Sequence, residues 1–489
     1  MNRKYSLHFV TILLIATMCV VGSPGASAQS QSVEGFWAGA LDTGAFKLRL
    51  VMKFSRTPDG KLKGLLDSLD QGANDIPMSV VTFQNGALHV EMKSLGATYD
   101  GKLSADGTQI TGEFMQGGAK LPLDLKRIEK VSDVSRKRPQ TPSKPYPYDE
   151  VEVTYQNQQD KITFGATLTV PRGAGPFPAV VLITGSGLQD RNETLLGHQP
   201  FLVLADYLTR RGIAVLRADD RGIGGTSKGS PNDTSENYVG DALAGVEFLK
   251  TRKEINPKQI GLVGHSEGGM IAPMAATRSN DVAFIVLMAG PGLVGDKLLA
   301  MQNGLISAAE CENAVKQSVA QVERLFVIAK DEKDPAVARQ KMKAESVKIS
   351  ESARKKLEGQ LSSLDARTNE ILSPWFRFFL SYDPRPTLMK VHIPVLALNG
   401  EKDTQVPARE DLEAIEQALK DGGNRDYKIV LLPKLNHLFQ TSKTGSPSEY
   451  AEIEETIAPV ALETMGDWIV VHTRSRSDRV MGLADSTAR

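Results

Sequence analysis

Residues Ile260 to Met270 read IGLVGHSEGGM and place a serine between glycines where an apolar strand gives way to a helix. Gly264, Ser266 and Gly268 fit the pattern G-x-S-x-G, which alone is a weak signal because glycine and serine are common. Between a strand and a helix the pattern is more specific, since the tight turn leaves no room for side chains at the glycines. Such a turn exposes the serine hydroxyl at a helix N-terminus, where backbone N–H groups stabilise developing negative charge. We therefore predict that Ser266 is a nucleophile.

A serine hydroxyl is a poor nucleophile until a base takes its proton. His437, in the stretch LLPKLNHLFQ, lies just after the last predicted strand, where a loop can carry it over the edge of the sheet. His89 falls in the N-terminal part of the chain, and His265 is held inside the turn that bears the serine. His437 is therefore the predicted base.

The acid of such a site orients the imidazole and stabilises its cation. Asp403, in VLALNGEKDTQVP, follows the penultimate predicted strand and completes the chain order Ser, Asp, His. Glu401 is the near alternative, and Asp296, after the preceding strand, is the more distant one. Placement and chain order favour Asp403.

An oxyanion that develops on a substrate needs N–H donors. The first is predicted to be the backbone N–H of Glu267, which follows the serine. The second should come from the loop TGSGLQDRNE after the first buried strand, with Ser186 as the first choice and Gly187 next. This loop fits neither a P-loop nor G-x-G-x-x-G, so a phosphate cradle is not expected. In the loop RADDRGIGGTSKG, Asp220 and Arg221 are expected to brace the loops around the site.

Beyond Asp149, apolar strands alternate with amphipathic helices, which is typical of an open, mostly parallel sheet flanked by helices. The predicted strands include FPAVVLITG, IAVLRADDRG, QIGLVGHS, VAFIVLMAG, IPVLALNGEKD and YKIVLLP. FLVLADYLTRRG and NYVGDALAGVEFLKTR are predicted helices. A charged helical insertion runs from about Leu298 to Tyr382, and an insertion of that size would form a cap above the sheet.

The insertion ends in the aromatic stretch SPWFRFFLSYDP, just before the chain re-enters the sheet. These rings either line an acyl pocket over the serine or only pack the cap onto the core, because exposed aromatic clusters invite aggregation. The candidate pocket residues are Trp375, Phe376, Phe378 and Phe379.

Residues 33–128 show short runs with a period of two, such as FKLRLVMKF and ALHVEMK, separated by turn signals such as Asn85-Gly86. This predicts a small antiparallel barrel or sandwich, which serves either as an accessory or lipid-binding module or as a packing partner for the next domain. The proline-rich basic stretch RKRPQTPSKPYPY that follows is expected to be a solvated linker rather than a binding patch.

The segments TGSGLQDRNE, LRADDRGIGGTS, GHSEGG, LALNGEKD and LNHLFQ stand in the order found in α/β-hydrolases. From Tyr148 to about Trp468 the chain resembles the bacterial serine carboxylesterase group of that superfamily, near its serine aminopeptidase-like and prolyl-oligopeptidase-like branches. The resemblance implies an α/β-hydrolase fold with Ser266, Asp403 and His437 as the catalytic triad. It is less specific for substrate, and neither the N-terminal β domain nor the cap belongs to the common core.

The predicted organisation divides the chain into seven segments. They are 1–28, a signal peptide; 31–130, an all-β domain; 131–148, a proline-rich basic linker; 149–297, the first part of the hydrolase core; 298–385, the helical cap; 386–472, the second part of the core; and 473–489, a polar tail.

The N-terminus carries the marks of a signal peptide: a short basic region, an apolar run from Phe9 to Val21 and the small-residue stretch Ala26-Ser27-Ala28. The apolar run is short for a membrane span, although a retained anchor is the alternative. Export to the periplasm or the medium is expected, with a mature chain that starts near Gln29. Only Cys311 then remains, so a monomer would hold no disulfide.

Lys plus Arg equals Asp plus Glu, at 58 each, so no global charge favours nucleic acid or an acidic membrane surface as a partner. No cofactor and no metal site are expected, and a homo-oligomer is left open. The leading hypothesis is an exported carboxylesterase that hydrolyses short acyl esters through an acyl-enzyme. The alternatives are a peptidase or amidase that uses the same triad, and a non-catalytic protein whose β domain holds an apolar ligand.

Overall fold

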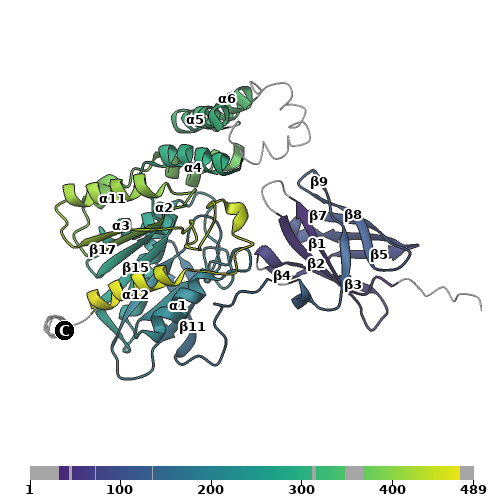
Figure 1. The fold of residues 1–489 in the computed structure, drawn as a ribbon, viewed down its shortest axis with the longest axis horizontal. Coiled ribbons are helices and arrows are strands. Elements are labelled where there is room, and N and C mark those ends of the chain that lie inside the picture. Colours follow the sequence, from purple (N-terminus) through teal and green to yellow (C-terminus); the bar gives the residue numbers. More distant parts are fainter. Residues whose placement is uncertain are drawn as a thin grey trace, which may run out of the picture.

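A computed structural model describes residues 32–42, 47–71, 73–134, 136–310, 315–346 and 368–473. The predicted signal peptide, Cys311 and the tail beyond residue 473 lie outside this described part. Figure 1 shows a layered body of helices around one sheet and a second body made of strands, joined by an extended segment. Within the described residues no helix is both long and apolar enough to cross a membrane.

The N-terminal body is a single antiparallel sheet of 10 strands, in the order β4-β3-β2-β1-β10-β8-β7-β6-β5, with β9 paired to β8. It curls into a half-barrel around a core that includes Trp37 and Tyr99, both fully buried. Along β6 the alternate residues Leu88, Val90 and Met92 are buried, which is the period-two pattern of a sheet with one covered face. The strands are β1 (Gly35–Asp42), β2 (Lys47–Arg56), β3 (Leu62–Ser68), β4 (Ala73–Pro77), β5 (Val80–Gln84), β6 (Ala87–Met92), β7 (Ala97–Leu103), β8 (Gln109–Gln116), β9 (Ala119–Pro122) and β10 (Leu125–Ile128).

The second body contains an 8-stranded sheet in the order β11-β12-β14-β13-β15-β16-β17-β18. The first two pairings of this order, β11 with β12 and β12 with β14, are antiparallel, and all the others are parallel. The strands are β11 (Asp149–Asn157), β12 (Ile162–Val170), β13 (Phe177–Ile183), β14 (Ala214–Ala218), β15 (Ile255–His265), β16 (Phe284–Met288), β17 (Val395–Gly400) and β18 (Tyr427–Leu432). This is the mostly parallel sheet that the alternating sequence pattern predicts.

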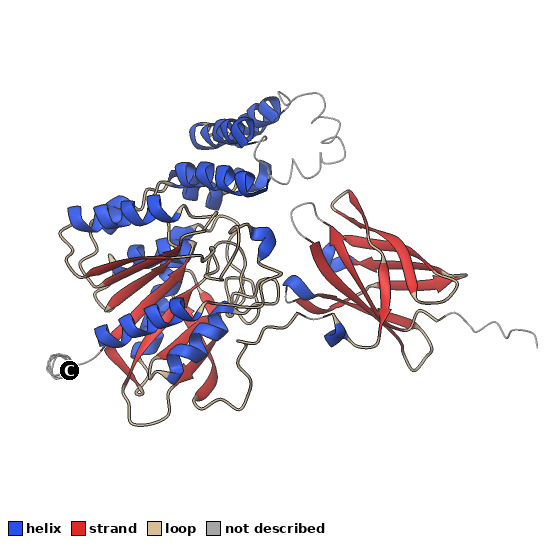
Figure 2. Cartoon of the chain, viewed as in Figure 1, coloured by secondary structure: helices blue, strands red, loops and turns tan. Residues whose placement is uncertain are grey.

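Helices cover both faces of this sheet (Figure 2). They are α1 (Pro200–Arg210), α2 (Ser235–Lys250), α3 (Glu267–Ala276), α11 (Ala408–Asp421) and α12 (Pro459–Thr473). Side chains of α2, α3 and α11 share one hydrophobic core, and those of α1 and α12 share the other. Both faces of the sheet are therefore dry, which explains why its strands read as continuous apolar runs.

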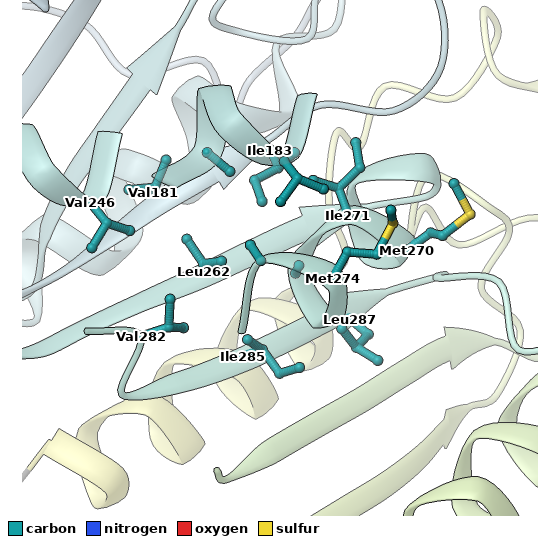
Figure 3. Packing of buried hydrophobic residues seen from close by; sticks show 14 of the residues in the cluster. Val181, Ile183, Val246, Leu262, Met270, Ile271, Met274, Val282, Ile285 and Leu287 are labelled. Atoms are coloured by element: carbon teal, nitrogen blue, oxygen red, sulfur yellow. The ribbon is translucent and has the colours of Figure 1, made fainter. Parts of the chain in front are cut away.

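Strand β13 shows how one strand supplies both cores. Val181 and Ile183 point to the side of α2 and α3, as Figure 3 shows, and the neighbours Val180 and Leu182 point to the side of α1 and α12. Alternation of side chains along an extended strand has this effect. The strand is thereby anchored on both faces, and so is the loop that follows it.

The insertion between β16 and β17 is helical, as predicted, and Figure 1 shows its first helices above α3 and α11. Its described helices are α4 (Gly295–Glu310), α5 (Val315–Asp331), α6 (Pro335–Ser346), α9 (Pro374–Ser381) and the short α10 (Arg385–Leu388). An ion pair between Asp296 and Lys330 joins α4 to α5.

The proline-rich segment between the two bodies is docked rather than solvated, which corrects the sequence-based expectation. Arg138 donates hydrogen bonds to the carbonyl groups of Leu196, Ala451 and Ile453 at 2.7, 3.0 and 2.8 Å. Gln140 exchanges hydrogen bonds with the backbone around Ile457. The physical reason is that backbone carbonyls of these irregular loops need donors, and the half-buried Arg138 supplies several in a fixed geometry.

Candidate active site

The turn that bears Ser266 has the tight geometry expected from its glycines. Ser266 has φ 53° and ψ −117°, a strained conformation for a residue with a side chain. A Cβ atom on Gly264 would lie 2.0 Å from the carbonyl oxygen of Gly268, and one on Gly268 would lie 2.2 Å from that of Ile183. Neither distance is compatible with a side chain, so these positions require glycine. The serine is held at the N-terminus of α3.

The sheet topology brings the serine and the glycine-rich loop together. After β13 the chain turns back to β14 on one side, while β15 pairs with β13 on the other, so the connections diverge between β13 and β15. Ligands of open α/β sheets bind at such a divergence, beyond the carboxyl ends of the strands. Ser266 follows β15 and the loop that begins at Thr184 follows β13. A Cβ atom on Gly185 would lie 3.4 Å from the Cβ atom of Ser266.

Two backbone N–H groups of this loop are free to serve an oxyanion. No described residue accepts a hydrogen bond from the N–H of Ser186 or Gly187, whereas the N–H of Gly185 donates to Glu193. Glu267 is the first residue of α3, where helix N–H groups have no intrahelical acceptor. The backbone N–H groups of Ser186, Gly187 and Glu267 are therefore all available to donate hydrogen bonds to an oxyanion.

His437 and Asp403 are brought into direct contact by the loops after β18 and β17. Their Nδ1 and Oδ2 atoms lie 2.7 Å apart, and both residues are buried. The other carboxylate oxygen of Asp403 accepts the backbone N–H groups of Gln405 and Val406 at 2.7 and 2.9 Å. These donors fix the carboxylate, and the carboxylate in turn orients the imidazole.

The ring of His437 also lies beside the turn that holds the serine. Its centroid is 4.9 Å from that of His265, the residue before Ser266. Among the described residues, no hydrogen bond joins the Ser266 hydroxyl to the His437 ring, and such bonds are often long until a substrate is bound. Serine, histidine and aspartate are thus neighbours at one edge of the sheet.

The alternative acids have other partners. Glu401 pairs with Arg409 at 3.2 Å, and Asp296 is paired with a lysine inside the cap. His89 lies in the N-terminal sheet, where its Nδ1 is 2.6 Å from Asp100. None of the three touches His437 or Ser266 in the described contacts.

Asp220 fastens both ends of the loop that carries the predicted oxyanion donors. Its carboxylate accepts the hydroxyl of Thr184 and the backbone N–H of Gln189, each at 2.8 Å. Burial raises the pKa of this carboxyl to about 7, although the two hydrogen bonds act to lower it. Arg221 braces a second region, because it pairs with Asp233 just before α2 and with Asp241 within α2.

The side chain of Glu267 has a structural role that the sequence did not reveal. It is buried, and its Oε1 atom accepts hydrogen bonds from Ser235 of α2 at 2.5 Å and from the indole N–H of Trp375 at 2.7 Å. Burial raises its pKa above the ordinary value. The residue after the serine therefore ties the cap helix α9 to the core.

The four aromatic side chains of α9 make different contacts. Phe379 is buried in the core of the sheet domain, and Phe376 packs on Phe326 of α5 with ring centroids 6.0 Å apart. Phe378 stacks on Tyr382 at 5.5 Å. Only Trp375 reaches a residue next to the nucleophile, through its hydrogen bond to the Glu267 side chain.

A cavity of about 460 Å³ opens beside the serine, and none of these four aromatic residues lines it. Its wall begins at Glu267 and Ile271 of α3 and continues through Tyr238 of α2 to Gly187 and Leu188 of the glycine-rich loop. The volume lies in the range usual for small-molecule sites. In the described residues no three His, Cys, Asp or Glu side chains gather as metal ligands would.

Comparison with known proteins agrees with this fold. A family model described as serine aminopeptidase, S33, matches residues 199–442. Esterase EstD of Thermotoga maritima is 27% identical over 308 residues, and the match covers 63% of this chain and 64% of EstD. The chain thus spans less than two thirds of that relative's length. A putative carboxymethylenebutenolidase of Yersinia pestis is 34% identical over 94 residues, which are 19% of this chain and 32% of that protein.

A solved structure of Est1E from Butyrivibrio proteoclasticus with ferulic acid bound is 17% identical, with a TM-score of 0.39, and the alignment covers 65% of this chain and 98% of that one. The sheet topology, the family match and the similarity to EstD show that the chain has the α/β-hydrolase fold, which confirms the predicted fold class. Within that superfamily the matches support a bacterial esterase.

Sequence reasoning missed the buried pair formed by Glu193 and His265. Glu193 lies in the quoted segment TGSGLQDRNE, and His265 lies in the quoted turn. The Nδ1 atom of His265 is 2.9 Å from Oε1 of Glu193. No local signal in the sequence indicates which of the charged residues in that loop turns inward.

Proposed function

We propose that the protein is a serine carboxylesterase that hydrolyses short-chain acyl esters through an acyl-enzyme. The observation that carries the proposal is the buried Asp403–His437 pair, which lies at the same sheet edge as a serine held in a strained turn. Strain of this kind is kept where surrounding structure enforces it, and it clusters at active sites. An esterase relative and a serine hydrolase family match support the same reaction.

In the proposed reaction the Ser266 oxygen attacks the ester carbonyl carbon while Nε2 of His437 takes the hydroxyl proton. Asp403 stabilises the resulting imidazolium through Nδ1–H. The carbonyl oxygen becomes an oxyanion and is stabilised by the N–H of Glu267 together with that of Ser186 or Gly187. The imidazolium then gives its proton to the leaving alcohol, and an acyl-enzyme remains. Water, deprotonated by His437, attacks the acyl carbon and releases the acid.

The cavity beside Glu267 is the best candidate for the acyl group. It starts at the predicted oxyanion donors and is lined in part by apolar side chains such as Leu188 and Ile271. An acyl chain whose carbonyl oxygen lies between those donors can extend into it. The indole N–H of Trp375 donates to the side chain of Glu267, which lines the cavity, so helix α9 affects the shape of this pocket through that hydrogen bond.

The proposal is tested by labelling with a fluorophosphonate followed by turnover of nitrophenyl esters of increasing acyl length. The wild type should label once, at Ser266, and turn over short esters best. Ser266→Ala should fold, fail to label and lose turnover by orders of magnitude, on the order of 10⁶ in a well-studied protease. Turnover in the variant at a tenth of the wild-type rate would contradict the assignment.

A peptidase or amidase with the same triad is the second candidate, because the matching family model carries the description serine aminopeptidase. The two are separated by paired substrates that share one acyl group and differ only in an ester or an anilide bond. An esterase should show kcat/KM for the ester far above that for the anilide. Comparable values would favour the peptidase.

We also infer export, with the signal peptide removed near Ala28. The inference is supported by the basic region, apolar run and small-residue stretch at the N-terminus. Cell fractionation and N-terminal sequencing of the mature protein test it: a chain that starts near Gln29 in the periplasm or the medium is expected. Recovery of the full-length chain in the membrane fraction would favour a retained anchor.

A further inference from the structure

Glu193 lies between two loops that the proposed reaction needs. Its Oε1 atom accepts the backbone N–H of Gly185 at 2.8 Å and is 2.9 Å from Nδ1 of His265. Both Glu193 and His265 are buried. A single carboxylate oxygen therefore contacts the glycine-rich loop on one side and the serine-bearing turn on the other.

His265 continues the connection to the loop of the base. Its Nε2 atom lies 3.1 Å from the backbone carbonyl oxygen of His437. A carbonyl oxygen only accepts, so Nε2 of His265 carries a proton. Although burial alone would lower the pKa of His265, the carboxylate of Glu193 raises it above its ordinary value. Gly185, Glu193, His265 and His437 thus form one continuous hydrogen-bonded chain.

The loop that carries Glu193 is itself held tightly. The carboxylate of Asp190 accepts the backbone N–H groups of Asn192 and Thr194, each at 3.0 Å, and the Thr194 hydroxyl at 2.7 Å. Glu193 has φ 53°, a left-handed conformation that a side-chain-bearing residue keeps only where its surroundings enforce it. The loop therefore presents the carboxylate in a fixed place.

We propose that Glu193 is a positioning residue that couples the oxyanion loop to the loop of the catalytic base. Through Gly185 it sets where the N–H groups of Ser186 and Gly187 lie, and through His265 it sets the backbone of His437. The inference rests on the proposed esterase function, because it concerns the geometry of that site. Glu193 contacts neither Ser266 nor the ring of His437 among the described hydrogen bonds, so its effect is indirect.

Replacement of Glu193 separates this role from general stability. Glu193→Ala removes both contacts and is expected to lower kcat about tenfold to a hundredfold with little change in KM, since displacement of a catalytic group by about 1 Å can cost 10²-fold. Glu193→Gln keeps one acceptor oxygen, which can still accept the N–H of Gly185, but it removes the negative charge beside the His265 ring, so its kcat should lie between those of the wild type and Glu193→Ala. Glu193→Asp keeps the charge but shortens the reach, and it should lose kcat as well.

A double variant tests the coupling through His265. Residues that act as one unit give losses that do not add. The loss of kcat in Glu193→Ala combined with His265→Ala should therefore be smaller than the product of the two single losses. The matched control is Asp206→Ala. Asp206 lies on α1, and its carboxylate accepts hydrogen bonds from the Tyr148 hydroxyl and the Arg210 guanidinium. The control should lower the melting temperature and leave kcat per labelled active site unchanged.

All rates are normalised to the fraction of molecules that a fluorophosphonate labels. A wild-type kcat per labelled site in Glu193→Ala, or in Glu193→Asp if the alanine variant does not fold, would overturn the inference. Losses that multiply in the double variant would overturn the coupling through His265. Failure of the proposed function looks different, because the wild type itself would then turn over no ester.

Discussion

The role of the negative charge of Asp403 can be tested with asparagine, because an amide oxygen can still accept the two backbone N–H groups that hold the side chain in place. The Oδ1 atom accepts two backbone N–H groups, and Oδ2 faces Nδ1 of His437. In Asp403→Asn the side-chain NH₂ would face Nδ1 and select the wrong imidazole tautomer. The equivalent change in a serine protease lowers kcat about 10⁴-fold, and we expect a loss of that order.

The matched control for this variant is Glu401→Gln. Glu401 precedes Asp403 by two residues and contacts Arg409 rather than the histidine. Its replacement should leave the nitrophenyl ester kcat within about twofold of the wild type, because an exposed ion pair contributes little. Equal losses in both variants would show that Asp403 has no special role.

Asp220 predicts a pH dependence of stability. Burial holds the pKa of its carboxyl at about 7 in the folded protein, above the ordinary value of 3.8. The folded state therefore binds a proton that the unfolded state releases near pH 4, and stability falls as pH rises from about 4 to 7. Asp220→Asn cannot titrate, and an asparagine oxygen can still accept the N–H of Gln189.

The variant should therefore gain stability relative to the wild type as pH rises, on the order of a few kcal/mol at pH 8. Urea unfolding of both proteins at pH 5 and pH 8 measures the difference. The wild type and the variant share all other titrating groups, including Asp411, whose pKa burial also raises to about 7. Parallel stability curves across this range would refute the assignment.

At the scale of elements, helix α9 combines packing and pocket functions in neighbouring residues. Trp375 donates to the Glu267 side chain at the wall of the cavity, while Phe376 packs on Phe326 inside the cap. Trp375→Ala should therefore enlarge the space behind the wall and shift the preference toward longer acyl chains. Each additional buried methylene contributes ~0.8 kcal/mol, which is roughly fourfold in kcat/KM.

Phe376→Ala serves as the comparison in the same helix. It should lower the melting temperature, because a ring contact within the cap is lost, and leave the ranking of acyl lengths unchanged. The measurement is kcat/KM on nitrophenyl esters from acetate to octanoate for both variants. If neither variant changes the ranking, helix α9 does not limit the acyl group.

At the scale of the whole molecule, the segment between the two bodies joins the N-terminal sheet to the back of the active site. Arg138 binds the carbonyl of Leu196, and the N–H of Leu196 donates to the carbonyl of Asp70, beside the end of β3. Leu196 packs in turn on Leu438, the residue after the predicted base. Burial and the charges of Arg136 and Arg49 lower the pKa of Arg138 to about 10.

Loss of this connection should destabilise the protein and weaken catalysis together. Arg138→Met removes three hydrogen bonds from a charged donor and should lower the free energy of unfolding by about 2 kcal/mol, with a lower kcat. Arg136→Ala removes only a pair with the exposed Glu452 and should cost less than about 1 kcal/mol. Urea unfolding and ester turnover distinguish them, and equal effects would argue against a specific role for Arg138.

The sequence by itself determined the features that depend on local patterns. The apolar strands, the glycines at 264 and 268 and the chain order of Ser266, Asp403 and His437 follow from spacing and turn sterics. They predicted an open, mostly parallel sheet with a nucleophile turn, and the resemblance that they carry implied the α/β-hydrolase fold. Parallel strands end at the same edge, so residues far apart in sequence meet there without further information.

Only the tertiary structure decided how the surrounding side chains are paired. The inward turn of Glu193, the link from Glu267 to Trp375 and the docking of Arg138 all join segments that are distant in sequence. Each depends on which buried polar groups of one loop face the unsatisfied groups of another. Buried donors and acceptors must find partners, but the sequence does not say which, because that choice is made by the packing of loops that follow no periodic pattern.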